Sequence, residues 1–153
     1  MGIKSYIGKR AKPTKGSSEN IKVSDYMSRN ITTFRPEQSV LEVMNTLIKK
    51  KISGGPVVNK NYELVGIISE GDCMKQISSS RYHNHPMQDM KVEEHMITEV
   101  ETIDGDMNVF DAADKFLTAR RRRFPIVENG KLVGLISQKD VLKAALELKG
   151  NTW

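Results

Sequence analysis

The feature that most constrains this chain is an internal repeat. Seven residues of the first half recur in the second half, always 69 positions later: Lys22, Val23, Met27, Thr33, Val40, Pro56 and Val58 match Lys91, Val92, Met96, Thr102, Val109, Pro125 and Val127. After a turn that is one residue shorter in the second half, residues 64–66 and three further positions recur 68 positions later. Because a repeat of this length is normally one supersecondary unit, the sequence predicts two copies of a single fold, over residues 21–79 and 90–149.

Each copy is predicted to fold in the order β-α-β-β-α. A short extended segment comes first, at residues 31–34 in copy one and 100–103 in copy two. The helix after it begins at Ser39 with a Ser-x-x-Glu capping box, and at Asn108 with a similar cap. Apolar side chains then recur at the spacing of one buried helix face: Val40, Val43, Met44, Leu47 and Ile48, and Val109, Ala112, Ala113, Phe116 and Leu117.

Two strands and a closing helix complete each copy. In copy two the strands flank Asn129-Gly130, which is a strong signal for a two-residue hairpin. The closing helices are expected over residues 71–77 and 138–148. A unit of this size cannot cover both faces of its own sheet, so the two βαββα units should pack on each other about a pseudo-twofold axis. The predicted fold class is therefore α/β (α+β), with two related clefts.

Outside the repeats the sequence predicts a basic leader over residues 1–20, expected to be flexible, and a polar linker over residues 80–89. The leader lacks a signal-peptide pattern, and no apolar run approaches the roughly 20 residues of a membrane span, so a cytoplasmic protein without membrane contact is expected. The single cysteine, Cys73, is predicted to be a small apolar helix residue. His83 and His85 are interpreted as linker residues, because they lack further metal ligands nearby.

The segments of greatest chemical interest lie where each copy passes from strand to closing helix. Both read Gly-apolar-Ile-Ser-x-x-Asp, ending at Asp72 and at Asp140. A helix N-terminus presents unpaired N–H groups that attract a phosphate, and a carboxylate one turn later suits the hydroxyls of a ribose. Ser-x-x-Asp is equally a plain capping box that needs no ligand, and a duplicated gene would duplicate its caps, so both interpretations stay open.

The combined pattern strongly resembles the cystathionine-β-synthase (CBS) domain. The Gly-apolar-Ile-Ser-x-x-Asp segments follow Gly-Pro-Val-Val or Phe-Pro-Ile-Val, and the first is preceded by a helix starting Ser-Val-x-Glu. The resemblance extends over residues 21–148, and two such domains in tandem are similar to a Bateman module. Such pairs commonly bind AMP, ADP or ATP between their repeats and assemble into homodimers, and related modules also accept S-adenosylmethionine or dinucleotides.

The resemblance implies a nucleotide-binding role for residues of both copies. Asp72 and Asp140 would hold ribose hydroxyls, with Ser69 and Ser137 near the phosphates. The remaining nucleoside contacts would come from two threonines at the first strands and four apolar residues around adenine: Thr33 and Thr102, and Val58, Ile68, Val127 and Ile136.

The arginine run at residues 120–123 accounts for much of the concentrated positive charge in a chain of net charge +5. Arg122 and Arg123 stand where nucleotide-binding members often place basic groups against phosphates. The run could also remain in water at a helix C-terminus, where its charge is favourable. Since strand residues alternate in direction, at least one arginine is expected to face the cleft. Copy one has Ser53-Gly54-Gly55 instead, so one good site and one weak or empty site are expected.

The sequence contains no nucleophile–base pair, metal cluster or P-loop, so the chain is expected not to be an enzyme and to need no catalytic cofactor. The preferred hypothesis is a regulatory, energy-sensing module that binds an adenine nucleotide, forms a homodimer and acts on a separate effector protein. The alternative is a ligand-free dimerisation or scaffold domain. Nucleic-acid binding through the basic segments is a third and less favoured interpretation, because the leader carries a single aromatic residue.

Overall fold

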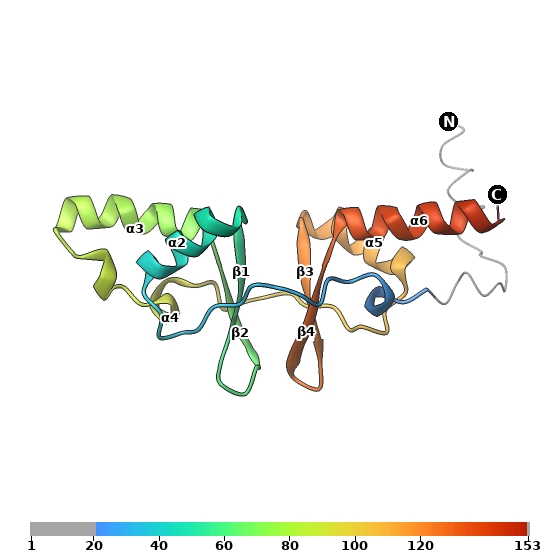
Figure 1. Ribbon diagram of the computed structural model, residues 1–153, viewed down its shortest axis with the longest axis horizontal. Coiled ribbons are helices and arrows are strands. Elements are labelled where there is room, and N and C mark those ends of the chain that lie inside the picture. The colour runs from blue at the N-terminus through green and yellow to red at the C-terminus, as the bar shows by residue number, and fades with distance from the viewer. Residues whose placement is uncertain (1–20, 153) are drawn as a thin grey trace.

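The computed structural model describes residues 21–152, so the predicted leader lies outside the described residues. Two similar halves stand side by side, each with a two-stranded antiparallel hairpin and two longer helices at the same end of the molecule (Figure 1). The helices and strands in chain order are η2 (Val23–Asp25), α2 (Val40–Lys50), β1 (Gly54–Val58), β2 (Leu64–Ser69), α3 (Glu70–His83), η3 (Met87–Asp89), α4 (Val92–His95), α5 (Val109–Ala119), β3 (Arg123–Glu128), β4 (Lys131–Ser137) and α6 (Gln138–Thr152). The predicted mixed α and β fold of two repeated units is confirmed.

The caps and the turn that the sequence specified are present. Ser39 Oγ accepts a hydrogen bond from Glu42 N at 3.1 Å, and Ser39 N donates to Glu42 Oε1 at 3.2 Å, which is the complete capping box. Asn108 caps α5 by accepting from Phe110 N at 2.7 Å. The β3–β4 turn has φ angles of 54° at Asn129 and 80° at Gly130, the positive values that a two-residue hairpin turn requires.

The predicted first strands are reduced to single bridges. Phe34 pairs in parallel with Val57, and Ile103 pairs in the same way with Ile126. The backbone around these bridges runs from one half of the molecule to the other (Figure 1). Only one residue of each predicted strand therefore pairs with the neighbouring hairpin. We call residues 22–34 the first crossing segment and residues 91–103 the second crossing segment.

The crossing segments exchange core residues between the two halves. Val23 and Met27 of the first segment pack with the copy-two core, among Phe116, Phe124 and Ile136. The segment that enters the second copy does the converse, placing Met90 and Val92 in the copy-one core, whose other members are Phe34, Val40, Val43, Leu47, Val57, Ile68 and Cys73. Each small unit therefore completes its core with apolar surface from its neighbour, which makes the halves mutually dependent.

Two sequence expectations need correction in the helices. Ile48 and Leu117 were assigned to the buried helix faces, but 79% and 77% of their surfaces are exposed. The buried face of each helix ends at Leu47 and Phe116, which are 5% and 4% exposed, and the next residue, about 100° further around the helix, points away from the core. The closing helix of copy one also extends to His83, beyond the predicted end at residue 77, and stops where Asn84 adopts a left-handed conformation two residues before Pro86.

Candidate functional site

The two strand-to-helix junctions are built alike. Asp72 Oδ2 accepts hydrogen bonds from Ser69 N at 2.9 Å and Ser69 Oγ at 3.1 Å. Asp140 Oδ2 accepts from Ser137 N at 2.8 Å and Ser137 Oγ at 3.0 Å. The Ser-x-x-Asp capping interaction that the sequence predicts is therefore present at both junctions. Because all four bonds end on Oδ2, the second oxygen of each carboxylate lies outside the cap.

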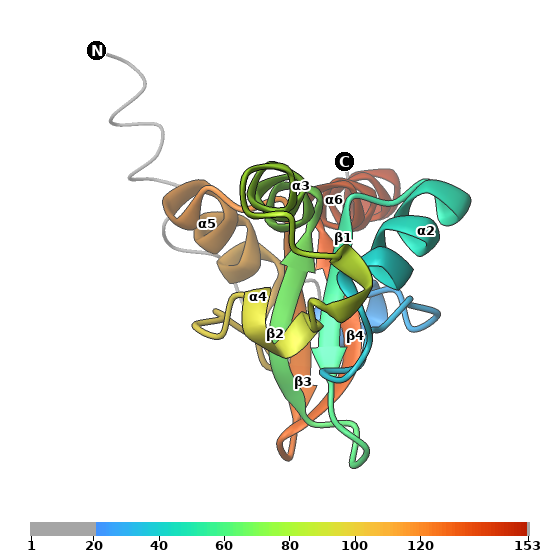
Figure 2. The same ribbon diagram turned by 90° about the vertical axis from the view of Figure 1, so that its left-hand side faces the viewer.

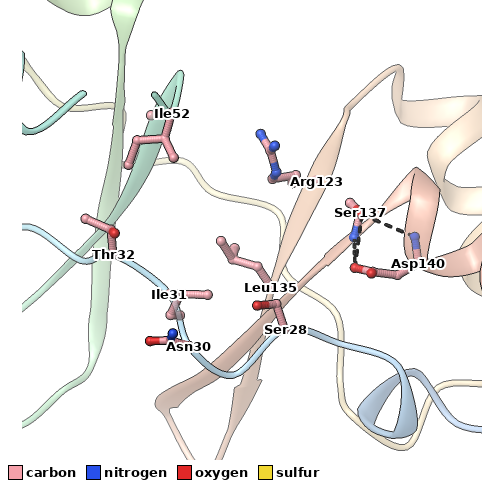
Figure 3. A pocket seen from close by; sticks show the side chains of 10 residues that line it. Ser28, Asn30, Ile31, Thr32, Ile52, Arg123, Leu135, Ser137 and Asp140 are labelled. Atoms are coloured by element: carbon pink, nitrogen blue, oxygen red, sulfur yellow. Dashed lines mark hydrogen bonds between the residues drawn. The ribbon is translucent and has the colours of Figure 1, made fainter. Parts of the chain in front are cut away.

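A cavity of about 300 Å³ opens beside the copy-two junction, and we call it the first cleft. It lies between the hairpins of the two copies, with Ser137 and Asp140 on one wall and Thr32 and Ile52 on the opposite wall (Figure 3). The complete lining is Ser28, Asn30, Ile31, Thr32, Ile52, Gly54, Arg123, Leu135, Ser137 and Asp140. One cavity thus combines a cation, a carboxylate, hydroxyl groups and apolar side chains.

Three of the predicted site residues meet in the first cleft: Arg123, Ser137 and Asp140. Arg122, the other arginine expected at phosphate, is exposed and lies outside this lining. The prediction that at least one arginine of the run faces a cleft agrees with this placement of Arg123, whose side chain lies between Ile52 and Ser137 in Figure 3.

Three of the predicted apolar contacts are absent from the lining of the first cleft. Val58, Ile68 and Ile136 are fully buried in or beside the cores, away from the lining. Leu135 lines the first cleft, because alternate residues of a strand point to opposite faces and Leu135 shares a face with Ser137. Thr32 of the first crossing segment also lines the cavity, and the predicted Thr33 is absent from the lining. The sequence shows that alternate residues of the strand face opposite sides. It does not show which of the two alternating sets of side chains faces the cleft.

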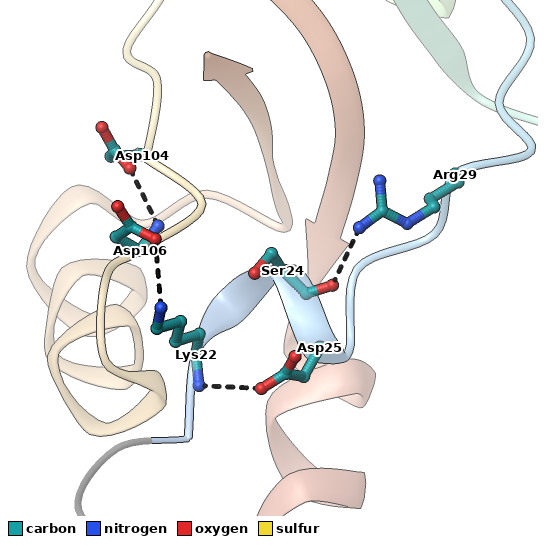
Figure 4. Close-up of polar contacts among 6 residues, drawn as sticks. All are labelled: Lys22, Ser24, Asp25, Arg29, Asp104 and Asp106. Atoms are coloured by element: carbon teal, nitrogen blue, oxygen red, sulfur yellow. Dashed lines mark hydrogen bonds and ion pairs between the residues drawn. The ribbon is translucent and has the colours of Figure 1, made fainter.

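The first crossing segment is anchored on copy two, and it supplies Ser28, Asn30, Ile31 and Thr32 to the first cleft. Its backbone donates from Val23 N to Met107 O at 2.9 Å, and Ser28 and Leu135 exchange bonds of 2.8 and 3.0 Å. Around its start, Lys22 Nζ lies 3.5 Å from Asp106 Oδ1 (Figure 4). These contacts hold one wall of the first cleft against the hairpin that forms the other wall.

The copy-one junction is more enclosed. Asp72 is 6% exposed, whereas Asp140 is partly exposed to the cavity. The predicted residues Thr102 and Val127 line a different cavity of about 280 Å³. Its walls come from the second crossing segment, from β2 and from the β3–β4 hairpin, and Leu64 and Gly130 also border it. Neither Ser69 nor Asp72 belongs to that lining.

Cys73 is buried in α3, as predicted from the sequence. Burial, followed by the negative charges of Asp72 and Glu70, raises the pKa of its thiol, which keeps the sulfur protonated and unreactive. Among the residues that the structure describes, no group of three or more His, Cys, Asp or Glu side chains is placed to hold a metal ion. Within the same range, each helix is too short or too polar to cross a bilayer.

The fold and the clefts define a module of two intertwined α+β repeats with a strand-to-helix junction at each cleft. The family model for the CBS domain matches residues 23–79 and 92–147. Because the two matches cover most of the chain, the protein belongs to the CBS domain family, as the sequence motifs implied, and carries a tandem pair, or Bateman module.

Among curated proteins, the chloroplastic CBS domain-containing protein CBSX2 of Arabidopsis thaliana is 30% identical over 156 residues, covering 85% of this chain and 66% of its own length. The inosine-5'-monophosphate dehydrogenase of Aquifex aeolicus is 34% identical over 127 residues, covering 82% of this chain but only 25% of the enzyme. This chain therefore spans part of the length of both relatives, and of the dehydrogenase it matches a minor portion.

Solved structures agree with the family assignment. A crystal structure of CBSX2 in complex with AMP has a TM-score of 0.71 and 29% identity, covering 84% of this chain and 98% of that chain. A second structure of CBSX2, described as a CBS-pair protein, has a TM-score of 0.75 and 27% identity, covering 87% and 99%. At this similarity, a neighbour with the same arrangement of repeats holds AMP.

Proposed function

We propose that this chain is a regulatory module that binds an adenine nucleotide in the first cleft. The observation that carries the proposal is the convergence of Arg123, Ser137 and Asp140 on one cavity beside the N-terminus of α6. A cation and a helix N-terminus favour a phosphate, while a carboxylate accepts hydrogen bonds from sugar hydroxyls. The AMP complex of the similar protein CBSX2 supports the same ligand class.

The rest of the lining suits the base. Ile31, Ile52 and Leu135 supply apolar surface for adenine, and Thr32 adds a hydroxyl. At about 300 Å³ the cavity is near the lower end of the roughly 300–1,000 Å³ typical of small-molecule sites, which favours a mononucleotide over a dinucleotide. AMP is therefore the first ligand to test, with ADP and ATP extending their additional phosphates toward solvent.

The test is calorimetric titration with AMP, ADP and ATP of the wild type and of Asp140→Ala. Loss of hydrogen bonds to a charged group typically costs about 1.5–3 kcal/mol, so binding should weaken at least tenfold. Asp72→Ala is the matched control, because it removes the equivalent cap bonds and about the same 0.5–2 kcal/mol of folding stability while leaving the first cleft intact. Absence of heat with all three nucleotides would refute the proposal.

We propose further that the module forms a homodimer through its helical end. The longer helices of both copies lie at that end in two perpendicular views (Figures 1 and 2). They expose apolar side chains at repeat-related positions: Leu41 and Phe110, Ile48 and Leu117, and Met74 and Leu142, joined by Ile77 and Leu146. A monomer rarely exposes so many, and a surface that repeats itself about a pseudo-twofold axis is complementary to a second copy.

The double variant Ile48→Asp, Leu117→Asp tests the dimer. Both side chains are far from the core, so folding should be retained while the mass measured by light scattering falls from two chains to one. A wild type that is monomeric at micromolar concentration would contradict this part of the proposal. Nucleotide-dependent output to a separate effector protein requires that the nucleotide bind two conformations of this dimer with different affinity.

A ligand-free scaffold remains the second candidate, and the hydrogen bonds that both carboxylates accept from their own caps favour it. The two candidates differ in their response to mutation. A scaffold would lose equal stability in the Asp72→Ala and Asp140→Ala variants and would show no change in melting temperature with nucleotide, whereas a ligand bound to the folded state raises it.

A further inference from the structure

Arg120, Arg121 and Arg122 join α5 to β3 at the helical end of the molecule, and we call these three residues the arginine turn (Figure 1). The next residue, Arg123, lines the first cleft, but the arginine turn lies outside that lining. All three of its side chains are exposed. The nucleotide site therefore does not account for these three cations.

The backbone of the arginine turn is held at each of its residues. Arg120 has a left-handed conformation, with a φ angle of 55°, and its N–H donates to Phe116 O at 3.1 Å. The Arg121 carbonyl accepts from Gln138 Nε2 at 3.1 Å, and the Arg122 carbonyl accepts from Gln138 N at 3.4 Å. Because the start of α6 fixes this backbone, a partner that binds the side chains does not have to order the turn first.

The side chains of the arginine turn lack carboxylate partners within the described part of the chain. The ion pairs there join Lys22 to Asp106 and Lys115 to Glu101, and they involve none of the three arginines. An arginine presents a planar fork of N–H donors that can bind a carboxylate or a phosphate through two hydrogen bonds at once. Three such forks on a fixed backbone form a surface that is complementary to a cluster of anions.

The same turn in copy one lacks this charge. The positions equivalent to the arginine turn are residues 51–53, which read Lys-Ile-Ser. The backbone is alike, since Lys51 has a φ angle of 56° and Glu70 N donates to Ser53 O at 2.9 Å. Copy one also has the acidic Glu70 where copy two has the neutral Gln138. The turn therefore forms without arginines, and its fold does not explain them.

Nucleic acid fits the arginine turn less well than an acidic protein does. Single strands bind basic surfaces with the help of aromatic side chains on which bases stack. The exposed aromatic side chains of the described residues include Tyr62 in the β1–β2 turn, Tyr82 near the end of α3, and Phe110. Phe110 belongs to the first turn of α5, about 15 Å along the helix from the arginine turn. A duplex needs cations along several phosphates, whereas three consecutive residues span at most about 10 Å.

We infer that the arginine turn is a docking site for an acidic segment of another protein, one that presents several Asp or Glu side chains in a short stretch. The inference rests on the part of the proposed function in which a separate effector protein receives the output, and it assigns the chemistry of that partner. Since Arg123 continues from the turn into the first cleft, the bound partner lies beside the nucleotide. Opposite charge supplies the attraction, and the fork geometry of arginine supplies specificity.

The first test measures binding of a fluorescent twelve-residue peptide of alternating Glu and Ser to the full chain by fluorescence anisotropy. The same peptide with Gln in place of Glu is the control probe and should bind much more weakly. The triple variant Arg120→Gln, Arg121→Gln, Arg122→Gln should bind the acidic peptide at least about tenfold more weakly than the wild type. Equal binding of the two peptides by the wild type, or no binding of the acidic peptide at low salt, would overturn the inference.

The matched control variant is Lys49→Gln, Lys50→Gln, Lys51→Gln. It removes the same number of positive charges from the corresponding end of α2 and, like the arginine variant, changes one residue in a left-handed conformation. At physiological salt, where the general field of distant charges is screened, it should lose less than about threefold in affinity for the acidic peptide. Equal losses in the two triple variants would show that only net charge matters and would overturn the docking site.

The second test compares the acidic peptide with a thymidine oligonucleotide of the same length. The oligonucleotide should bind more weakly at physiological salt. If it bound more tightly and the arginine variant lost that binding, the turn would be assigned to nucleic acid and the inference would be wrong. Failure of the proposed function would look different, since the wild type would give no heat with AMP, whereas failure of the docking site alone leaves AMP binding intact.

Discussion

The two copies of the repeat carry the same Ser–Asp junction between strand and closing helix, but the surroundings of that junction differ. Their crossing segments form the same bridges, and their junctions have the same Ser–Asp cap. Yet Asp140 borders an open cavity while Asp72 is 6% exposed. The comparison teaches that the cap is part of the fold and persists in both copies, whereas the exposure of its carboxylate depends on the residues around it, which differ between the copies.

The largest expected effect comes from the point where each crossing segment passes over its hairpin. A Cβ at Gly134 would lie 2.6 Å from Met27 Sδ and 2.9 Å from Ser28 O, and at Gly66 it would meet Met96 and Ile97 at the same distances. Gly134→Ala and Gly66→Ala should each lower the free energy of unfolding by about 1–3 kcal/mol, measured by denaturant titration.

The two glycine variants should differ in nucleotide binding. Gly134→Ala displaces Ser28 and with it the wall of the first cleft, so AMP affinity should fall as well, whereas Gly66→Ala should keep wild-type affinity at a temperature where it is folded. If both variants lost AMP affinity to the same extent, a change at Gly66 in copy one would affect the first cleft as strongly as a change at Gly134 beside it.

Arg123→Ala should have an intermediate effect that is confined to phosphate. Removing one charge-assisted contact should weaken AMP binding about tenfold, while adenosine binding should change little. Arg122→Ala removes the same charge from the neighbouring exposed position and serves as the control. Calorimetry at two salt concentrations would separate a direct contact from a general field effect, because the field effect of both arginines should be screened alike. Equal losses in the two variants would show that Arg123 has no specific role.

The smallest expected effect concerns the anchor of the first crossing segment. The Tyr26 hydroxyl donates to Glu147 Oε1 of α6, and this bond, followed by burial, raises the pKa of Tyr26 above 10.0. The stabilisation is complete below the unfolded pKa and is lost as the pH rises through the folded one. Thermal melts from pH 8 to 11 should therefore show a steeper loss in the wild type than in Tyr26→Phe.

The equivalent residue of the second crossing segment is His95, so His95→Phe is the matched control for that comparison. It should leave the alkaline dependence unchanged. An identical pH profile for the wild type and Tyr26→Phe would mean that the bond to Glu147 does not contribute in solution.

Local sequence patterns were enough to predict most of the architecture. The Ser39 and Asn108 caps and the Asn129-Gly130 turn each depend on neighbours within a few positions, and the 69-residue repeat is found by comparing the sequence with itself, so each can be recognised without knowing the fold. The motifs around Asp72 and Asp140 also identified the family. The same local patterns placed Ser137 and Asp140 at the strand-to-helix junction, where the structure has them, and Arg123 just before the strand that it begins in the structure.

Only the tertiary structure decided which side of each helix or strand faces the core, the cleft or solvent. An alternating or helical pattern defines a period, but its phase relative to a cleft depends on how the element packs against the rest of the molecule. That is why Thr32 and Leu135 line the cavity instead of Thr33 and Ile136, and why Ile48 and Leu117 are exposed. The exchange of crossing segments between the halves is likewise a property of long-range packing, because contacts between distant residues leave no period in the sequence.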